Sequence, residues 1–359
     1  MTEFWTLGVG LPKIAARQAE AAEGAGWDGL LLVDSQNLAG DCYVGLAMAA
    51  RVTERIGLGT GVTNPVTRHP AVAAGAIATV QAESGGRAVL GIGRGDSSLA
   101  HLGLAPASVA ELEAHVAAVQ AYLRGDELPF GAAPSPGGRA LSTLGLAGQP
   151  SASRLHWLRP DQPKVPVDVF ATGPKVLGVA GRLADRVTFA VGAEAERVVW
   201  ARDTVRRART DAGLDPEGID VGACVNLVCH PDPDVALGLA SGGLASFARF
   251  SVMHGTPTGP VSDAESSALR RLHSAYDMNR HTMAGSPQAG ALDADFAHRF
   301  AILGPVDHCV ARLNQLAAAG VRRFVIIGPA ADADRAEGRA SVARLVNEVV
   351  PAVREAAAP

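Results

Sequence analysis

The sequence contains few lysines and few aromatic residues. Only three of its 32 basic residues are lysines, at positions 13, 164 and 175, and aromatic residues make up 4% of the 359 residues. The formal net charge is −4, and no run of like charges or basic stripe occurs. Nucleic-acid binding relies on clustered positive charge and on aromatic side chains that stack with bases. We therefore expect no nucleic-acid partner.

Cysteine is also sparse, and its spacing does not suit metal binding. The four cysteines form no C-x-x-C pair. Cys224, Cys229 and His230 lie along one expected strand, where side chains alternate between faces and do not converge on one ion. We expect buried, reduced thiols and no metal.

Long apolar segments are missing as well. The sequence opens without a positively charged, apolar leader, and no uncharged apolar run approaches the roughly 20 residues that span a bilayer. These absences predict a cytoplasmic protein that does not enter a membrane.

The sequence does contain a regular alternation of short apolar runs and longer stretches with helical spacing of apolar residues. Such alternation indicates parallel strands joined by right-handed helical crossovers. Eight units without a clear break favour a closed α/β barrel, a (β/α)8 TIM barrel, over an open doubly wound sheet. The expected strands are residues 5–10, 29–33, 56–62, 88–92, 165–171, 186–190, 220–229 and 323–327.

Two segments interrupt the alternation within what we expect to be one domain over residues 1–359. Residues 125–163 are rich in Pro, Gly and Ser, which predicts an irregular insertion. The longer interruption, residues 231–304, follows the seventh strand. Loops that leave barrel strands open on the C-terminal face, where active sites lie, and long loops are usually functional. This second insertion is therefore a candidate lid over the substrate.

Polar and glycine-rich residues collect at the ends of the expected strands. Asp34 ends the second strand, residues 59–65 (GTGVTNP) the third, 91–97 (GIGRGDS) the fourth and 171–175 (ATGPK) the fifth. Glycine lets the backbone approach a flat ligand closely, although G-x-G-x-G alone also fits a tight turn. The turn before Lys175 fits a phosphate at a helix N-terminus and equally an ordinary helix start with proline.

These motifs together resemble the luciferase-like monooxygenase superfamily. The resemblance lies in GTGVTNP at 59–65, RHP at 68–70, GRAVLGIGRGD at 86–96, ATGPK at 171–175 and AGRLAD at 180–185, and in Asp34. It covers nearly the whole chain. It is strongest to the branch that uses coenzyme F420, the methylenetetrahydromethanopterin reductases.

The resemblance implies a TIM barrel with a deazaflavin at its C-terminal mouth. It implies a non-prolyl cis peptide between Gly61 and Val62, in a bulge under the ring, and hydride transfer between ring carbon 5 and a substrate. The protein then supplies positioning and exclusion of water. By the same resemblance Asp34 is a catalytic candidate, and the cofactor-binding candidates are Asp34, Gly61, Val62, Thr63, Asn64, Gly93, Arg94, Gly95, Asp96, Ser97, Ala171, Thr172, Gly173, Pro174 and Lys175.

The sequence departs from this branch at two positions. Gly10 stands where methanopterin reductases carry a glutamate, and Ser35 stands where a histidine often follows the aspartate. Both changes remove a proton donor, and we expect them to open space on the substrate side of the ring. His254 is a second catalytic candidate, and the candidates for contacting substrate are Gly10, Ser35, His254 and His281. We expect His69 to be structural.

The sequence therefore predicts an F420-dependent oxidoreductase that acts on a C=C, C=N, alcohol or carbonyl group of a small molecule. The alternative is an FMN-dependent two-component monooxygenase of the same superfamily. A non-catalytic flavin-binding barrel is a third, weaker interpretation. Beyond a small-molecule substrate, the one partner that we consider is a second copy of the chain, in a homodimer.

Overall fold

The core of the protein is a closed barrel of eight parallel strands. The computed structural model describes residues 2–132 and 139–356. Each strand pairs in parallel with the next, and the last pairs with the first, so the predicted (β/α)8 barrel is confirmed. Its strands, in order, are β1 (Glu3–Val9), β2 (Gly29–Val33), β3 (Gly57–Thr60), β4 (Ala88–Ile92), β7 (Val167–Ala171), β8 (Arg186–Phe189), β9 (Asp220–Cys229) and β11 (Arg323–Ile327).

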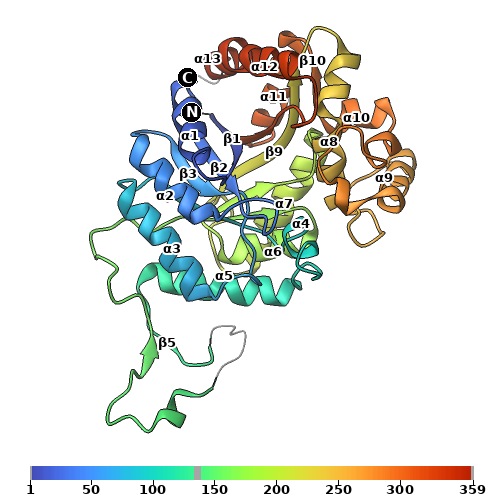
Figure 1. The fold of residues 1–359 in the computed structure, drawn as a ribbon. Coiled ribbons are helices and arrows are strands. Elements are labelled where there is room, and N and C mark those ends of the chain that lie inside the picture. The colour runs from blue at the N-terminus through green and yellow to red at the C-terminus, as the bar shows by residue number, and fades with distance from the viewer. Residues whose placement is uncertain (1, 133–138, 357–359) are drawn as a thin grey trace.

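Helices cover the outside of the barrel (Figure 1). They are α1 (Ala15–Gly24), α2 (Cys42–Val52), α3 (Pro70–Glu83), α5 (Val109–Arg124), α6 (Pro174–Leu183), α7 (Ala195–Asp211), α11 (Val306–Ala318) and α12 (Arg335–Arg344), which continues through a π-helical turn (Leu345–Val349) into α13 (Val350–Ala356). Within residues 2–132 and 139–356, no helix is both long enough and apolar enough to cross a membrane.

The expected strands agree with the structure except at their ends. One such difference is in β3, which was expected to continue to Val62 but ends at Thr60. Beyond Thr60 the backbone leaves the sheet, and Thr63 returns to form an isolated bridge with Ile92 of β4. Apolar patterning cannot detect this departure because the residues involved remain small or apolar.

Glycine and an internal ion pair shape the barrel interior. Trp5 fills the space over Gly29 and Gly57, where any Cβ atom would overlap the indole ring. Nearby, Arg323 is buried inside the barrel and its Nη2 lies 2.9 Å from Oδ2 of the buried Asp168. A buried charge of this kind requires a close partner of opposite sign. The interior is therefore filled by side chains and is not a channel.

The first insertion is an arm that leaves the barrel after α5 (Figure 1). Its described part contains a short antiparallel ladder between β5 (Leu128–Pro129) and β6 (Ala152–Ser153) and a 3-10 turn, Leu141–Leu144. The arm returns along α3, where the Gln162 side-chain amide donates to the carbonyl oxygen of Ala78. Most of the arm therefore lies away from the barrel mouth.

The second insertion is mainly helical, which corrects the expectation of a long loop. Asp232 caps the first helix with its side chain, and Ser262 and Glu265 form a capping box at the second. Both helices bury apolar faces in a satellite core. Its elements are α8 (Pro233–Phe250), α9 (Asp263–Ala275), two 3-10 turns (Met278–Arg280 and Ala289–Ala291), α10 (Ala294–Phe300) and β10 (Ile302–Gly304), which pairs with β9.

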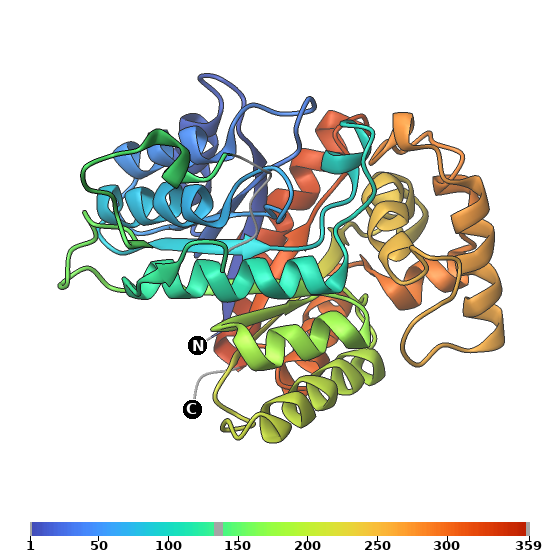
Figure 2. The ribbon, with the colours of Figure 1, turned by 90° about the horizontal axis from the view of Figure 1, so that it is seen from below.

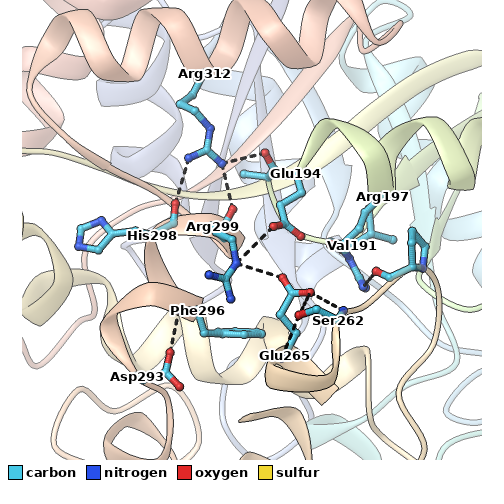
Figure 3. A network of polar contacts seen from close by, with 12 residues as sticks. Val191, Glu194, Arg197, Ser262, Glu265, Asp293, Phe296, His298, Arg299 and Arg312 are labelled. Carbon is cyan, nitrogen blue, oxygen red and sulfur yellow. Dashed lines mark hydrogen bonds and ion pairs between the residues drawn. The ribbon is translucent and has the colours of Figure 1, made fainter. Parts of the chain in front are cut away.

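Arginines attach this insertion to the barrel (Figure 3). Arg197 of α7 is only 3% exposed and donates from Nη1 to the carbonyl oxygen of Pro260, at 2.8 Å. Arg299 of α10 points between two carboxylates, with Nε 3.7 Å from Glu194 and 3.2 Å from Glu265. Because these contacts lie between α7, α9 and α10, the insertion is fixed to one side of the barrel.

A buried histidine on α5 makes the stability of the barrel depend on pH. His115 is fully buried. Burial, with a contribution from the nearby His69, lowers the pKa of His115 from 6.5 to about 4. The unfolded chain therefore binds a proton at this residue at a pH where the folded chain does not.

We predict that the wild type loses about 2 kcal/mol more unfolding free energy than His115→Leu when the pH is lowered from 7.5 to 5. The loss begins below pH 6.5, where the unfolded histidine becomes protonated. Urea unfolding of both proteins across this pH range measures the difference. Parallel pH profiles would show that folding does not lower the pKa of His115.

Candidate active site

A buried carboxylate lies where β2 ends at the barrel mouth. Asp34 is 3% exposed and accepts hydrogen bonds at both oxygens. Its Oδ2 accepts from Thr63 Oγ1 at 2.7 Å and from Arg68 Nη1 at 2.5 Å, and its Oδ1 accepts from Gln36 Nε2 at 2.7 Å. The carboxylate thus joins the end of β2 to the segment after β3. Because its oxygens are already engaged, we infer a positioning role for it rather than proton transfer.

Arg68 holds this arrangement together. Its second terminal nitrogen donates to Asp41 at 2.8 Å, and the guanidinium lies 4.8 Å from the centre of the Tyr43 ring. Burial disfavours the charge, but the hydrogen bond and attraction of Asp34 outweigh it and raise the pKa of Arg68. The guanidinium therefore stays charged and fixes Asp34 in one orientation.

The segment after β3 crosses close to β4. The peptide between Gly61 and Val62 is cis, as the resemblance implied. Thr63 then donates its backbone N–H to the carbonyl oxygen of Gly91, and Gly93 donates to the carbonyl oxygen of Thr63, each at 3.0 Å. These bonds bring Val62, Thr63 and Asn64 alongside the turn after β4.

Glycines make this crossing possible and leave bare backbone at the mouth. A Cβ atom on Gly91 would overlap the carbonyl oxygen of Thr60, and one on Gly93 would lie 3.2 Å from Val62 Cγ2. Gly95 adopts φ of +80°, a conformation that other residues rarely adopt. At these glycines the ends of β3 and β4 therefore present backbone without side chains.

Among the residues that the structure describes, two buried amide donors at the mouth have no hydrogen-bond partner. Asn64 is buried and uses Oδ1 to accept from the backbone N–H groups of Val66 and Thr67, yet its Nδ2 has no hydrogen-bond partner. Asn226 of β9 is also buried with an unpaired Nδ2. Buried polar groups rarely remain unpaired without a reason. A ligand with carbonyl oxygens would satisfy such donors.

The turn after β4 contacts the second insertion through opposite charges. Asp96 forms an ion pair with Arg249 of α8, and both side chains are largely buried. Arg94 donates from Nη1 to His254 Nε2 at 3.1 Å. An arginine can only donate, so Nε2 of His254 acts as an acceptor and carries no proton in this arrangement.

The turn after β7 forms an open helix N-terminus. Gly173 is the N-cap of α6, with Pro174 in the first turn and no side-chain cap. Thr172 donates from Oγ1 to the carbonyl oxygen of Ala190 at 3.2 Å, which fixes the turn, and Lys175 is exposed beside it. Uncapped N–H groups with an adjacent lysine can bind a phosphate.

Gly10 does not open space, contrary to our expectation. A Cβ atom there would lie 3.2 Å from the carbonyl oxygen of Asp41, and one on Gly40 would overlap the carbonyl oxygen of Gly10. Two backbone segments meet at this point, so an acidic side chain would require the loop to move. Ser35 begins the turn that leads there and accepts two backbone hydrogen bonds. His69, expected to be structural, caps α3 through Nδ1.

The sequence analysis missed several residues of this site. Arg68 belongs to the RHP motif at 68–70, but the sequence did not indicate its role. No sequence pattern pointed to Arg249 or Tyr276. His281, predicted near the substrate, lies with its Nδ1 2.6 Å from the Tyr276 hydroxyl. Alanines and glycines dominate the segment around Arg249, so only contacts in the folded chain reveal its partner.

Taken together, the mouth offers a bare-backbone platform, unpaired amide donors and an open helix N-terminus. These features fit a flat, oxygen-bearing ring with a phosphate tail. Among the nearby groups, Cys42 is fully buried, and burial raises the pKa of its thiol, so it is a poor nucleophile. The arrangement favours cofactor binding over nucleophilic catalysis.

The chain is similar in sequence to luciferase-like monooxygenases and to a methanopterin reductase. The family model for luciferase-like monooxygenases matches residues 9–323. The 5,10-methylenetetrahydromethanopterin reductase of Methanolobus tindarius is 28% identical over 328 residues, covering 88% of this chain and 90% of that protein.

Two solved structures share the fold. The F420-dependent tetrahydromethanopterin reductase of Methanopyrus kandleri superposes with a TM-score of 0.72 at 23% identity, covering 98% of this chain and 99% of that one. The monooxygenase RslO1 of Streptomyces bottropensis superposes with a TM-score of 0.63 at 19% identity, covering 97% and 99%. The fold alone therefore fits both a reductase and a monooxygenase.

We predict that Gly91→Ala lowers the unfolding free energy by about 3 kcal/mol, because its methyl group must displace the backbone of β3. Gly75→Ala on α3 is a matched control: its Cβ would meet only Leu155, at an ordinary 3.8 Å, and we expect it to stabilise the protein by about 0.5–1 kcal/mol. Chemical denaturation measures both. Equal stability of the two variants would show that the crossing at Gly91 is not tight.

Proposed function

The chain belongs to the luciferase-like monooxygenase family, and from that premise we propose that it is an oxidoreductase using coenzyme F420. It would transfer a hydride between carbon 5 of the deazaflavin and a C=C, C=N, alcohol or carbonyl group of a small organic molecule. The observation that carries the proposal is the likeness to a methylenetetrahydromethanopterin reductase over 88% of the chain. The bare platform between β3 and β4 supports it independently.

We assign the cofactor ring to the platform and its phosphate to α6. The unpaired Nδ2 of Asn64 would donate to a ring carbonyl oxygen, and the backbone at Gly93 and Gly95 would lie against the ring. The first turn of α6 and Lys175 would bind the phosphate. When bound, the cofactor supplies hydride chemistry; the protein orients it and excludes water.

Titration with F420 and with FMN tests this assignment, using fluorescence to follow both. We expect F420 to bind at least about tenfold more tightly, a difference of about 1.4 kcal/mol. Tighter binding of FMN would favour the two-component monooxygenase, because the carbon at position 5 of a deazaflavin does not readily form the peroxide that oxygenation requires. Binding of F420 without turnover of any substrate would favour the non-catalytic flavin-binding barrel, and binding of neither cofactor would contradict the proposal.

We predict that Lys175→Ala weakens F420 binding by about 1–3 kcal/mol, the range for a charge-assisted contact. Lys164→Ala serves as the control: Lys164 pairs with Asp185 at 2.6 Å, away from the strand ends that form the mouth, and should leave affinity unchanged. The same fluorescence titration measures both. Unchanged affinity in Lys175→Ala would place the phosphate elsewhere, with Arg94 the next candidate.

We also propose that the protein is a homodimer. An apolar stripe of Val44, Met48 and Val52 runs along α2, with Val44 65% and Met48 55% exposed, and Val72 of the adjacent α3 is 57% exposed. Large exposed apolar patches mark interaction sites, and a two-fold axis would pair the stripe with itself.

The double substitution Val44→Glu with Met48→Glu should convert the dimer to a monomer, because paired stripes would then place like charges together. Light scattering after size-exclusion chromatography measures the mass. Leu214→Glu, at an exposed leucine outside the stripe, is the control and should leave the mass unchanged. A wild type that is monomeric at high concentration would rule out this interface.

We further assign the protein to the cytoplasm. Its four cysteines are all buried and unpaired with one another. Free thiols are typical of reducing compartments, which supports this location.

A further inference from the structure

A polar cluster on the second insertion faces the turn after β4. It consists of Ser246 and Arg249 on α8, Tyr276 directly after α9, and His281 after the 3-10 turn Met278–Arg280. Arg249 joins the cluster to the turn through its ion pair with Asp96. Figure 2 shows α8 beside the segment that contains α4 (Ser97–Ala100), next to Asp96. The cluster therefore lies at the rim of the proposed cofactor site.

Arg249 orients the aromatic ring of Tyr276. Its guanidinium carbon lies 4.5 Å from the centre of that ring, while its Nη1 binds Asp96. A guanidinium over an aromatic face is attractive when both are partly removed from water. One arginine thus holds both the β4 turn and the tyrosine, which fixes their separation.

The hydroxyl of Tyr276 has two polar neighbours. His281 Nδ1 lies 2.6 Å away and Ser246 Oγ lies 3.3 Å away. Ser246 already donates its proton to the carbonyl oxygen of Gly242, so it can only accept from the tyrosine. Burial raises the pKa of Tyr276 to about 12 and lowers the pKa of His281. At neutral pH the phenol is therefore protonated and the imidazole neutral.

Several other candidate proton donors at the mouth are absent or engaged. Gly10 has no side chain that could donate a proton. The oxygens of Asp34 are bound by Arg68, Thr63 and Gln36, and Nε2 of His254 accepts from Arg94. Tyr276 is a half-buried acid with a neighbour close enough to return its proton.

We propose that Tyr276 is the catalytic proton donor to the substrate, with His281 and Arg249 as positioning residues. This inference rests on the proposed F420-dependent function and assigns the proton-transfer step of that same site. It also gives the helical insertion a chemical role, since both positioning residues belong to it.

With a carbonyl substrate, bound reduced F420 would supply the hydride to the carbonyl carbon and lose two electrons, and the C=O π pair would become a lone pair on oxygen. Tyr276 would give its phenolic proton to that oxygen as its O–H bond breaks. His281, in the tautomer that carries its proton on Nδ1, would return that proton to the phenolate while Nε2 takes one from water.

The test compares wild type, Tyr276→Phe and Tyr122→Phe with reduced F420 and three probes: acetone, cyclohex-2-enone and 1-pyrroline. Tyr122 binds Ser153 of the arm through its hydroxyl and is the matched control. We expect Tyr276→Phe to lower kcat by about 10²- to 10⁴-fold, the range for a general acid, with F420 affinity unchanged. Tyr122→Phe should retain wild-type kcat. Equal kcat in both variants would overturn the role of Tyr276 without affecting the proposed function.

A second readout does not depend on turnover. The chain has three tyrosines, so labelling the phenol carbon with ¹³C gives three NMR signals, and the signal missing in Tyr276→Phe identifies Tyr276. With oxidised F420 bound, adding acetone should shift the Tyr276 signal alone. An unshifted signal overturns the proposal even if the probes are reduced. Failure of the wild type to bind F420 would instead remove the proposed function, and this inference with it.

Discussion

The close approach of β3 and β4 at Gly91 is the constraint on which the site depends. Without a side chain at this position, the carbonyl oxygen of Thr60 can lie against the Gly91 backbone. The chain beyond Thr60 can then bond to β4 through Thr63, whose hydroxyl reaches Asp34. Asp34 in turn holds Arg68. A single missing methyl group thus allows a connected polar network to form at the barrel mouth.

This network holds the site in place and leaves few groups free to react. Asp34 is saturated with hydrogen bonds, and Arg68 remains charged between two carboxylates. Their shared role is to fix the segment of Val62 to Asn64 that would lie against a flat ring. Reactivity would then come from the cofactor, and protons from outside this network. This division of roles between protein and cofactor suits a fold that occurs in both reductases and monooxygenases.

Arginine has a recurring role in attaching the helical insertion. Arg197 binds backbone carbonyl oxygens near Pro260, Arg299 lies between two glutamates, and Arg249 reaches the turn after β4. The planar guanidinium offers several donors in fixed directions, so one side chain can join segments distant in sequence. Because lysines are nearly absent from this chain, arginine makes most of these connections. The result is an insertion whose polar side chains are held against the mouth.

The sequence by itself determined the barrel, its eight strands and the rim where a cofactor would lie, because these depend on local periodicity and on glycine at strand ends. It did not determine that residues 233–250 form a helix beside the mouth, since their alanines and glycines give little apolar periodicity. It also missed that Gly10 meets the backbone at Gly40, and that Arg249 joins Asp96 to Tyr276. These contacts bring together residues distant in sequence, and their geometry is set only when the strands close the barrel and the insertion packs beside it.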